Sequence, residues 1–383
     1  MKRKKRKKES ILGLVFAVCI LVFFILNMIV PNREISEQDN RMLAQRPKIT
    51  LESLVSGNYM TKYEEYLKDQ FVGRDILKNM QATLKRICGS KQENGVLIGK
   101  DDQLLEEIVT PETETLNENL NAINVFANAH EELNTYMLLV PDAANILSEK
   151  LPKLATVTNQ DRLFAQVSKS LDESVKWIDA TAVLDQHTSE DIYYKTDRYW
   201  TSLGAFYVFS EATEMLGISE TAPSSFVAYP VSTTYNGLLA ARSGAKLDVR
   251  EPIYIYTQKE STTEVVVNYV DEQRKTTTLY DSSKLETRDR YNVFLGGDTS
   301  LIDIKTVSED NRRLLLVKDS FANCFVQYLV PYFREIVVVD PRYYSGTIDD
   351  LMNTYRITDV MFLYGGNTFF QDNNISGVFN SEQ

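Results

Sequence analysis

The sequence predicts an α/β domain with a parallel sheet, preceded by one N-terminal transmembrane helix. Three observations lead to this prediction. A basic run is followed by twenty uncharged residues near the N-terminus, short apolar segments alternate with helical periodicity further on, and polar loops follow the apolar segments. Short, fully apolar strands separated by helices are typical of a parallel sheet that is covered on both faces.

The predicted anchor rests on two adjacent segments. Residues 2–8 read KRKKRKK, and residues 11–30 carry no charge. A helix needs about 20 apolar residues to cross a bilayer, and positive charge stays on the cytoplasmic side. We therefore expect a cytoplasmic tail at 1–10, a type II signal anchor at 11–30 and an extracytoplasmic remainder. The alternative is a cleaved signal peptide, but no small-residue cleavage site appears before Pro31.

The composition beyond the anchor excludes several classes of partner and site. Without the basic tail and Glu9, the chain holds 35 Lys and Arg against 52 Asp and Glu, a net charge of −17. Such a domain is repelled by nucleic acid. Cys88 and Cys324 either form one bridge or stay unpaired, and unpaired buried thiols are favoured. With only His130 and His187 and no cluster at ligand spacing, we expect neither a metal site nor a cofactor.

The first half of the chain gives the following order of elements. Residues 31–57 are polar and aperiodic, which predicts an extended stalk, and the folded domain is expected at 58–383. The segments that follow are helical spacing from Asn58, a hairpin in NGVLIGKDDQLLE from Asn94, a buried strand at 135–140, a helix at 161–171, a strand at 175–180 and an amphipathic helix at 202–216.

The second half interrupts and then resumes this alternation. Residues 221–311 are rich in Thr, Ser, Tyr and Val, which predicts a β-rich insertion with strand-like segments that include YNVFL. Three further strands are predicted in LLLV (314–317), EIVVV (335–339) and DVMFLY (359–364), with helices through Phe321 to Leu329 and around 348–355. Ligands of such sheets bind beyond the carboxyl ends of the strands.

Four polar loops lie where a ligand is expected. They are TDRYWT at 196–201, KDSF at 318–321, DPRYYSG at 340–346 and YGGNT at 364–368. A serine at a strand-to-helix turn, here Ser320, lies where backbone N–H groups can stabilise an oxyanion. The alternative is that Ser320 is simply a helix N-cap.

Eight segments together resemble the bacterial DHHW-motif family, which is related to the SGNH-like O-acetyltransferases of alginate and other exported polysaccharides. They are ISEQDNRMLAQRP, YEEYLKDQFVGRD, NGVLIGKDDQLLE, KTDRYWTSLGA, YNVFLGGD, LLLVKDSFANCFVQYL, DPRYYSG and ITDVMFLYGGNTF, and they run from about residue 34 to 370. The resemblance implies a doubly wound SGNH-hydrolase-like sheet with a permuted motif order, in which the Asp/His block precedes the Ser block.

The resemblance also implies roles for particular residues. Ser320 takes the place of the family's nucleophile and Asp197 that of its acidic residue. Asn367 lies in the loop that supplies an oxyanion-hole side chain, and Gly346 in the region of the glycine block. The name-giving motif, Thr-Asp-His-His-Trp-Thr, reads Thr-Asp-Arg-Tyr-Trp-Thr here, so that Tyr199 replaces the family's general base.

Loss of that histidine matters because a serine hydroxyl is a weak nucleophile without a base to take its proton. The pKa of a free tyrosine is about 10, so Tyr199 is a poor base at neutral pH. Nothing in the spacing of His187 favours it as a substitute. Arg198 stays protonated and can only attract an anionic group, and we expect it and Trp200 to line the binding surface.

Three functions follow from these residues. The protein is an accessory or glycan-binding member that is catalytically impaired, and this hypothesis is favoured by the missing base. It is alternatively an active O-acetyltransferase or esterase on an exported glycan, with Ser320 as nucleophile, Asp197 as orienting acid and an unidentified base. The third hypothesis is a structural protein of the cell envelope. The first two imply an exported polysaccharide as partner, and a membrane-bound O-acyltransferase beside it.

Overall fold

The computed structural model describes residues 92–244, 247, 249–259, 264–372 and 374–379, and in the N-terminal region 15, 17–18, 21–27, 29–33, 35–36, 41–50, 58–77 and 80. The chain divides into two compact units. One unit comprises residues 1–90 with 241–245, and the other comprises residues 91–240 with 246–383. The candidate site belongs to the second unit.

The N-terminal unit contains helix α3 (Asn58–Gln70) and a short hairpin of β1 (Ile35–Ser36) and β2 (Arg41–Met42). Residues 21–27 are helical. Among the described residues, no helix combines the length and the apolar character that crossing a membrane requires. Several positions of the expected anchor, at 11–14, 16, 19–20 and 28, lie outside the described residues. The anchor and the stalk therefore stay predictions.

The second unit is built on an eight-stranded sheet in the order β11-β10-β12-β14-β13-β15-β6-β7. Its five parallel strands are β6 (Asn134–Val140), β7 (Val175–Ile178), β13 (Arg313–Lys318), β14 (Glu335–Val339) and β15 (Asp359–Gly365). They coincide with the five strands that the apolar segments predict, except that β7 ends at Ile178, two residues before the predicted end, because Ala180 already begins a helix. The parallel sheet is confirmed. β14 is buried along its whole length, as a strand covered on both faces must be.

Residues 221–311 contribute strands to two different sheets. β8 (Phe226–Tyr235) and β9 (Glu251–Gln258) form a separate antiparallel pair. β10 (Val265–Tyr269), β11 (Arg274–Thr276) and β12 (Leu301–Thr306) instead extend the main sheet as antiparallel strands.

The expected strand in YNVFL is wrong. Residues Arg290–Val293 form a 3₁₀ turn, η5. Leu295, Gly296 and Gly297 follow with positive φ angles of 55°, 72° and 103°. The left-handed backbone of three successive residues cannot continue a strand, and glycine adopts it at little cost.

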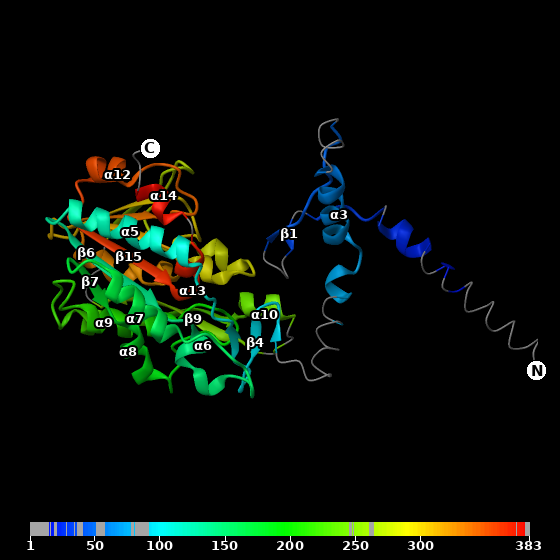
Figure 1. The fold of residues 1–383 in the computed structure, drawn as a ribbon, viewed down its shortest axis with the longest axis horizontal. Coiled ribbons are helices and arrows are strands. Elements are labelled where there is room, and N and C mark those ends of the chain that lie inside the picture. Colours follow the sequence, from blue (N-terminus) through cyan, green and yellow to red (C-terminus); the bar gives the residue numbers. More distant parts are fainter. Residues whose placement is uncertain are drawn as a thin grey trace, which may run out of the picture. The chain divides into compact units, whose positions relative to one another are not determined.

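Helices cover both faces of the sheet (Figure 1). One apolar cluster joins the sheet to α5 (Thr113–Ala129), α7 (Gln160–Ser170), α12 (Ile348–Tyr355), α13 (Gly366–Gln371) and α14 (Ile375–Phe379). The other joins it to α6 (Ala143–Ile146), α8 (Ala180–Leu184), α9 (Ser202–Ala212) and α11 (Val326–Leu329). Alternate residues of each strand enter the two clusters, Leu138 one and Leu139 the other, as the period of a strand requires.

The remaining elements are short. The predicted hairpin is present as β4 (Val96–Ile98) and β5 (Leu104–Glu106), with β3 (Gln92–Glu93) at its edge. The other short elements are helix α10 (Leu238–Ser243) and the 3₁₀ turns η1 (Ser148–Lys150), η2 (Asp185–His187), η3 (Ala222–Ser225), η4 (Ser282–Glu286), η6 (Ser320–Cys324) and η7 (Val330–Tyr332).

Candidate active site

The parallel register brings several polar loops to one edge of the sheet. Lys318 at the end of β13 pairs with Leu363 of β15, and Gly365 of β15 pairs with Val140 of β6. The segments that follow these strands therefore start side by side. Ser320 comes directly after β13, in the turn η6.

A residue from outside the predicted loops completes this edge. Strand β12 is antiparallel to β14, and Leu301 at its start pairs with Val339 at the end of β14. The loop before β12 therefore reaches the same edge as the loop after β14. Through this loop, Asp298 reaches Ser320, whose Oγ donates a hydrogen bond of 2.5 Å to Asp298 Oδ2.

Two cations stabilise the Asp298 carboxylate. Lys318 Nζ lies 3.2 Å from Oδ1 and an Arg342 guanidinium nitrogen lies 3.4 Å from Oδ2, while Asn323 Nδ2 donates to Oδ1 at 3.2 Å. Burial by itself would raise the pKa of Asp298, but the charges of Lys318 and Arg342 outweigh it and hold the pKa well below its usual range. Asp298 is therefore a stable anion and a weak base.

The two cations are themselves fixed by a second carboxylate, Asp340. Arg342 donates to both oxygens of Asp340 at 2.8 and 2.6 Å, and Lys318 Nζ lies 3.5 Å from Oδ2. Lys318 and Asp340 are almost wholly buried. Arg342 also reaches Ser320 Oγ at 3.4 Å, so the hydroxyl lies between one anion and one cation.

Tyr199 is the residue that the resemblance places at the position of the family's base. Its ring stacks on Tyr291 at 4.1 Å and meets Phe321 edge-on at 5.1 Å. Burial, together with the negative charges of Asp298 and Asp197, raises the pKa of Tyr199 well above its ordinary value, although the Arg198 charge and an interaction with the Ser320 hydroxyl oppose the shift. The phenol therefore stays protonated and acts as a donor.

Asp197 is enclosed by groups other than Ser320. Its carboxylate accepts hydrogen bonds from the Tyr235 hydroxyl, from the Leu238 backbone N–H at 2.8 Å and from the Arg198 backbone N–H at 2.6 Å. A Cβ at Gly237 would lie 2.2 Å from Asp197 Oδ2, so only glycine allows this close approach. In the described structure, no hydrogen bond joins Asp197 to Ser320.

Arg198 points into a buried acidic cluster. Its Nε lies 3.3 Å from Glu106 Oε2, and a guanidinium nitrogen donates to Thr368 Oγ1 at 3.1 Å. Burial, with the negative charge of Glu106, raises the pKa of Asp142 to about 7, and burial raises that of Asp319 to about 6. The Arg198 charge opposes both shifts, so its guanidinium compensates carboxylates of the protein itself.

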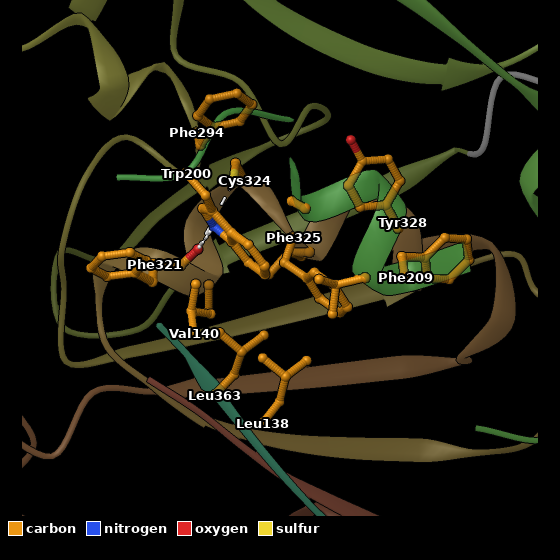
Figure 2. Packing of buried hydrophobic residues seen from close by; sticks show 14 of the residues in the cluster. Leu138, Val140, Trp200, Phe209, Phe294, Phe321, Cys324, Phe325, Tyr328 and Leu363 are labelled. Carbon is orange, nitrogen blue, oxygen red and sulfur yellow. Dashed lines mark hydrogen bonds between the residues drawn. The ribbon is translucent and has the colours of Figure 1, made fainter. Parts of the chain in front are cut away.

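Trp200 is a core residue and is hydrogen-bonded to the turn that contains Ser320. Its side chain is fully buried, its indole stacks on Phe325 at 5.8 Å, and Nε1 donates to the Phe321 carbonyl at 2.8 Å (Figure 2). The expected place of Trp200 on the binding surface is therefore wrong. The sequence pattern does not distinguish a buried tryptophan in a loop from an exposed one.

Asn367 holds the hairpin segment in place. Its Nδ2 donates to Glu107 O at 2.9 Å and its Oδ1 accepts from Val109 N–H at 2.9 Å. Gly346 packs against the Tyr344 ring, and its loop reaches Ser320 through Arg342.

His187 is directed to other partners than Ser320. Nδ1 lies 2.8 Å from Glu190, and the ring stacks on Tyr207 at 3.6 Å.

The cap of η6 is Asp319, whose side chain accepts from Phe321 N–H, so the alternative of Ser320 as N-cap is wrong. Cys324 is a free, buried thiol, while Cys88 lies outside the described residues.

Three residues of the candidate site, Asp298, Lys318 and Arg342, were not predicted from the sequence. Each lies in a segment that carries the family resemblance, YNVFLGGD, LLLVKDS or DPRYYSG. The signal that could have found Asp298 is its position after two glycines, because paired glycines permit a turn that presents a polar side chain at close range.

Comparisons with known proteins agree with this fold. The sequence pattern of the family described as DHHW protein matches residues 112–339, more than half of the chain. No curated protein sequence is significantly similar.

Similar solved structures include a DHHW family protein from Eubacterium siraeum, with 23% identity, 76% of this chain and 96% of that chain covered, and a TM-score of 0.63. Bacillus cereus PatB1 with a sulfonyl adduct has 21% identity, coverage of 74% and 98%, and a TM-score of 0.62. The O-acetyltransferase domain of Pseudomonas putida AlgJ has 16% identity, coverage of 75% and 99%, and a TM-score of 0.47. The two higher scores show a shared fold, and the matched family pattern confirms the resemblance: the chain belongs to the DHHW protein family.

Proposed function

We propose that this protein binds an exported polysaccharide and serves its acylation as a catalytically impaired member of the family, beside a membrane-bound O-acyltransferase. Membership in the DHHW family supports the link to polysaccharide acylation. The observation that carries the impairment is the hydrogen bond from Ser320 Oγ to Asp298, in a site where Tyr199 replaces the base.

The chemistry of acyl transfer explains why this arrangement is unfavourable. Ser320 Oγ must lose its proton as it attacks a carbonyl carbon. Asp298 is a weak acceptor because Lys318 and Arg342 lower its pKa, and Tyr199 is a donor. The negative charge of Asp298, which accepts a hydrogen bond from Ser320 Oγ, would also oppose the negative charge that develops on a carbonyl oxygen attacked by that hydroxyl.

A reactivity assay tests the impairment. PatB1 is described with a sulfonyl adduct, so phenylmethylsulfonyl fluoride is a suitable probe, together with p-nitrophenyl acetate. We expect no more adduct or acetyl-enzyme, measured by intact mass, than the Ser320→Ala variant gives. A stoichiometric adduct on Ser320 that disappears in Ser320→Ala would contradict the proposal.

That contrary result would favour the active alternative, a Ser-dependent O-acetyltransferase or esterase. One observation supports this second candidate: Ser320 Oγ lies between Asp298 and Arg342 at the ligand-binding edge of the sheet. Asp298 would then be the base that the sequence leaves unidentified. The structural alternative predicts neither turnover nor binding of any glycan.

The localisation is part of the proposal. The basic run at 2–8 and the uncharged segment 11–30 support a single-pass type II anchor with the folded unit outside the cell membrane. Protease added to intact cells should remove the folded unit while an N-terminal epitope tag stays protected. Protection of residues beyond 31 in intact cells, with cleavage after lysis, would contradict this topology.

A further inference from the structure

A cavity of about 580 Å³ lies between the segment that leads into the Ser320 site and the β8–β9 pair. We call it the Tyr254 groove. Its lining includes Asp191, Lys195, Arg250, Glu251, Tyr254 and Tyr256. Its volume falls in the range of small-molecule sites.

The wall of the groove is fixed by hydrogen bonds. Glu251 accepts from the backbone N–H groups of Lys195 and Thr196 at 2.6 and 2.9 Å, and from Thr196 Oγ1 at 2.6 Å. Ser202 Oγ donates to Tyr254 O at 2.6 Å. These hydrogen bonds, together with Thr201 in the lining, connect the groove to the loop of residues 196–201, which carries Tyr199.

The lining combines an aromatic surface with polar groups that are free to bind. Tyr254 is 40% exposed, and Asp191 and Arg250 are also exposed. Among the described residues, the side chains of Asp191 and Lys195 form no ion pair with each other or with a neighbour. An aromatic ring packs against the C–H face of a sugar, while carboxylate oxygens and ammonium groups bond its hydroxyls.

The charge of the groove indicates which sugars fit. The described lining holds the acidic residues Glu190, Asp191 and Glu251 and the basic residues Lys195 and Arg250, so it has no excess of positive charge. The whole chain carries a net charge of −11. A polyanionic uronate chain is repelled by such a surface, whereas a neutral sugar is not repelled.

We propose that the Tyr254 groove binds a neutral sugar segment of the polysaccharide and holds the chain so that it runs past the motif loop toward Ser320. This inference rests on the proposed function, because it names the class of glycan that the protein holds. It assigns the recognition of the glycan to residues that lie apart from the Asp298, Lys318 and Arg342 cluster.

The test measures binding of defined oligosaccharides to the full-length protein by isothermal titration calorimetry. The probes are a neutral tetramer of N-acetylglucosamine, a neutral tetramer of glucose and an acidic tetramer of mannuronate. We expect a neutral probe to bind and the mannuronate to bind at least about tenfold more weakly, which corresponds to about 1.4 kcal/mol.

Two variants and one matched control locate the binding. Tyr254→Ala and Asp191→Ala should each weaken binding of the neutral probe at least tenfold. Tyr229→Ala should leave it unchanged, because Tyr229 is 51% exposed on the neighbouring strand β8 but does not line the groove. Thermal unfolding of each variant checks that the fold is kept.

Each outcome decides between the inference and the proposed function. Unchanged binding in Tyr254→Ala and Asp191→Ala overturns the groove, while the glycan-binding function stands. Preference for mannuronate overturns the neutral class. Failure of the unaltered protein to bind any of the three probes overturns glycan binding itself, and the groove with it.

Discussion

Replacement of Tyr199 by histidine should raise the rate at which p-nitrophenyl acetate acylates Ser320 by about 10²-fold or more, the usual contribution of a positioned general base. The phenol of Tyr199 is held protonated beside the Ser320 hydroxyl, and the pKa of Tyr199 is raised well above its ordinary value by burial. An imidazole in its place has an unperturbed pKa of about 6.5 and accepts a proton at neutral pH.

The surroundings leave room for the new imidazole to be oriented. Asp197 accepts three hydrogen bonds, from Tyr235, Leu238 N–H and Arg198 N–H. A carboxylate offers about four lone-pair sites, so Asp197 keeps the capacity to accept a further hydrogen bond. The imidazole ring is smaller than the phenol ring, so it does not crowd Tyr291, on which residue 199 stacks.

Two controls separate base catalysis from an opened site. Tyr199→Phe removes the hydroxyl without adding a base and should leave the rate unchanged. Tyr199→His combined with Ser320→Ala should remove the gain. Were Tyr199→His to fold normally without any gain, the missing base would not be what limits the site, and Asp298 would be the remaining obstacle. The burst of p-nitrophenol and intact mass measure these rates.

The parallel part of the sheet could be predicted from the sequence because burial leaves a direct mark on it. Strands such as β14, with EIVVV, are covered on both faces and need apolar residues at nearly every position. YNVFL looks similar, but the glycines after it decide its structure. Leu295 takes a left-handed conformation there, so the segment turns where a strand would run on.

The site could be predicted only for residues that follow a parallel strand in the sequence. Ser320 and Asn367 follow parallel strands, so their place follows from the strand order. Asp298 reaches the same edge only because β12 runs antiparallel to β14, which apolar patterns do not reveal. Arg198 and Trp200 are neighbours in one loop, yet one compensates buried carboxylates and the other fills the core, because side-chain direction in a loop depends on tertiary contacts.

Replacement of Arg198 by glutamine should lower the free energy of unfolding by about 3–5 kcal/mol at pH 8, the usual cost of removing one partner of a buried charge cluster. Arg198 Nε lies 3.3 Å from Glu106 Oε2, so the guanidinium compensates this carboxylate directly. Its charge also opposes the rise that burial causes in the pKa of Asp142 and of Asp319. Without the guanidinium these carboxylates face one another in a buried site. Arg334→Gln, at an exposed arginine, is the matched control and should change the free energy by less than about 0.5 kcal/mol.

The same cluster fixes how this loss depends on pH. The pKa of Asp142 is about 7 and that of Asp319 about 6 in the folded protein, both above the ordinary value of 3.8. Between pH 4 and 7 the folded protein therefore holds protons that the unfolded chain has released, and its stability falls as the pH rises. Removal of the Arg198 charge raises both pKa values further. At pH 5 Asp142 and Asp319 of Arg198→Gln are protonated and neutral, so the loss should be clearly smaller there than at pH 8. Urea unfolding at the two pH values measures both losses, and an equal loss at pH 5 and pH 8 would show that Arg198 acts through packing rather than through charge.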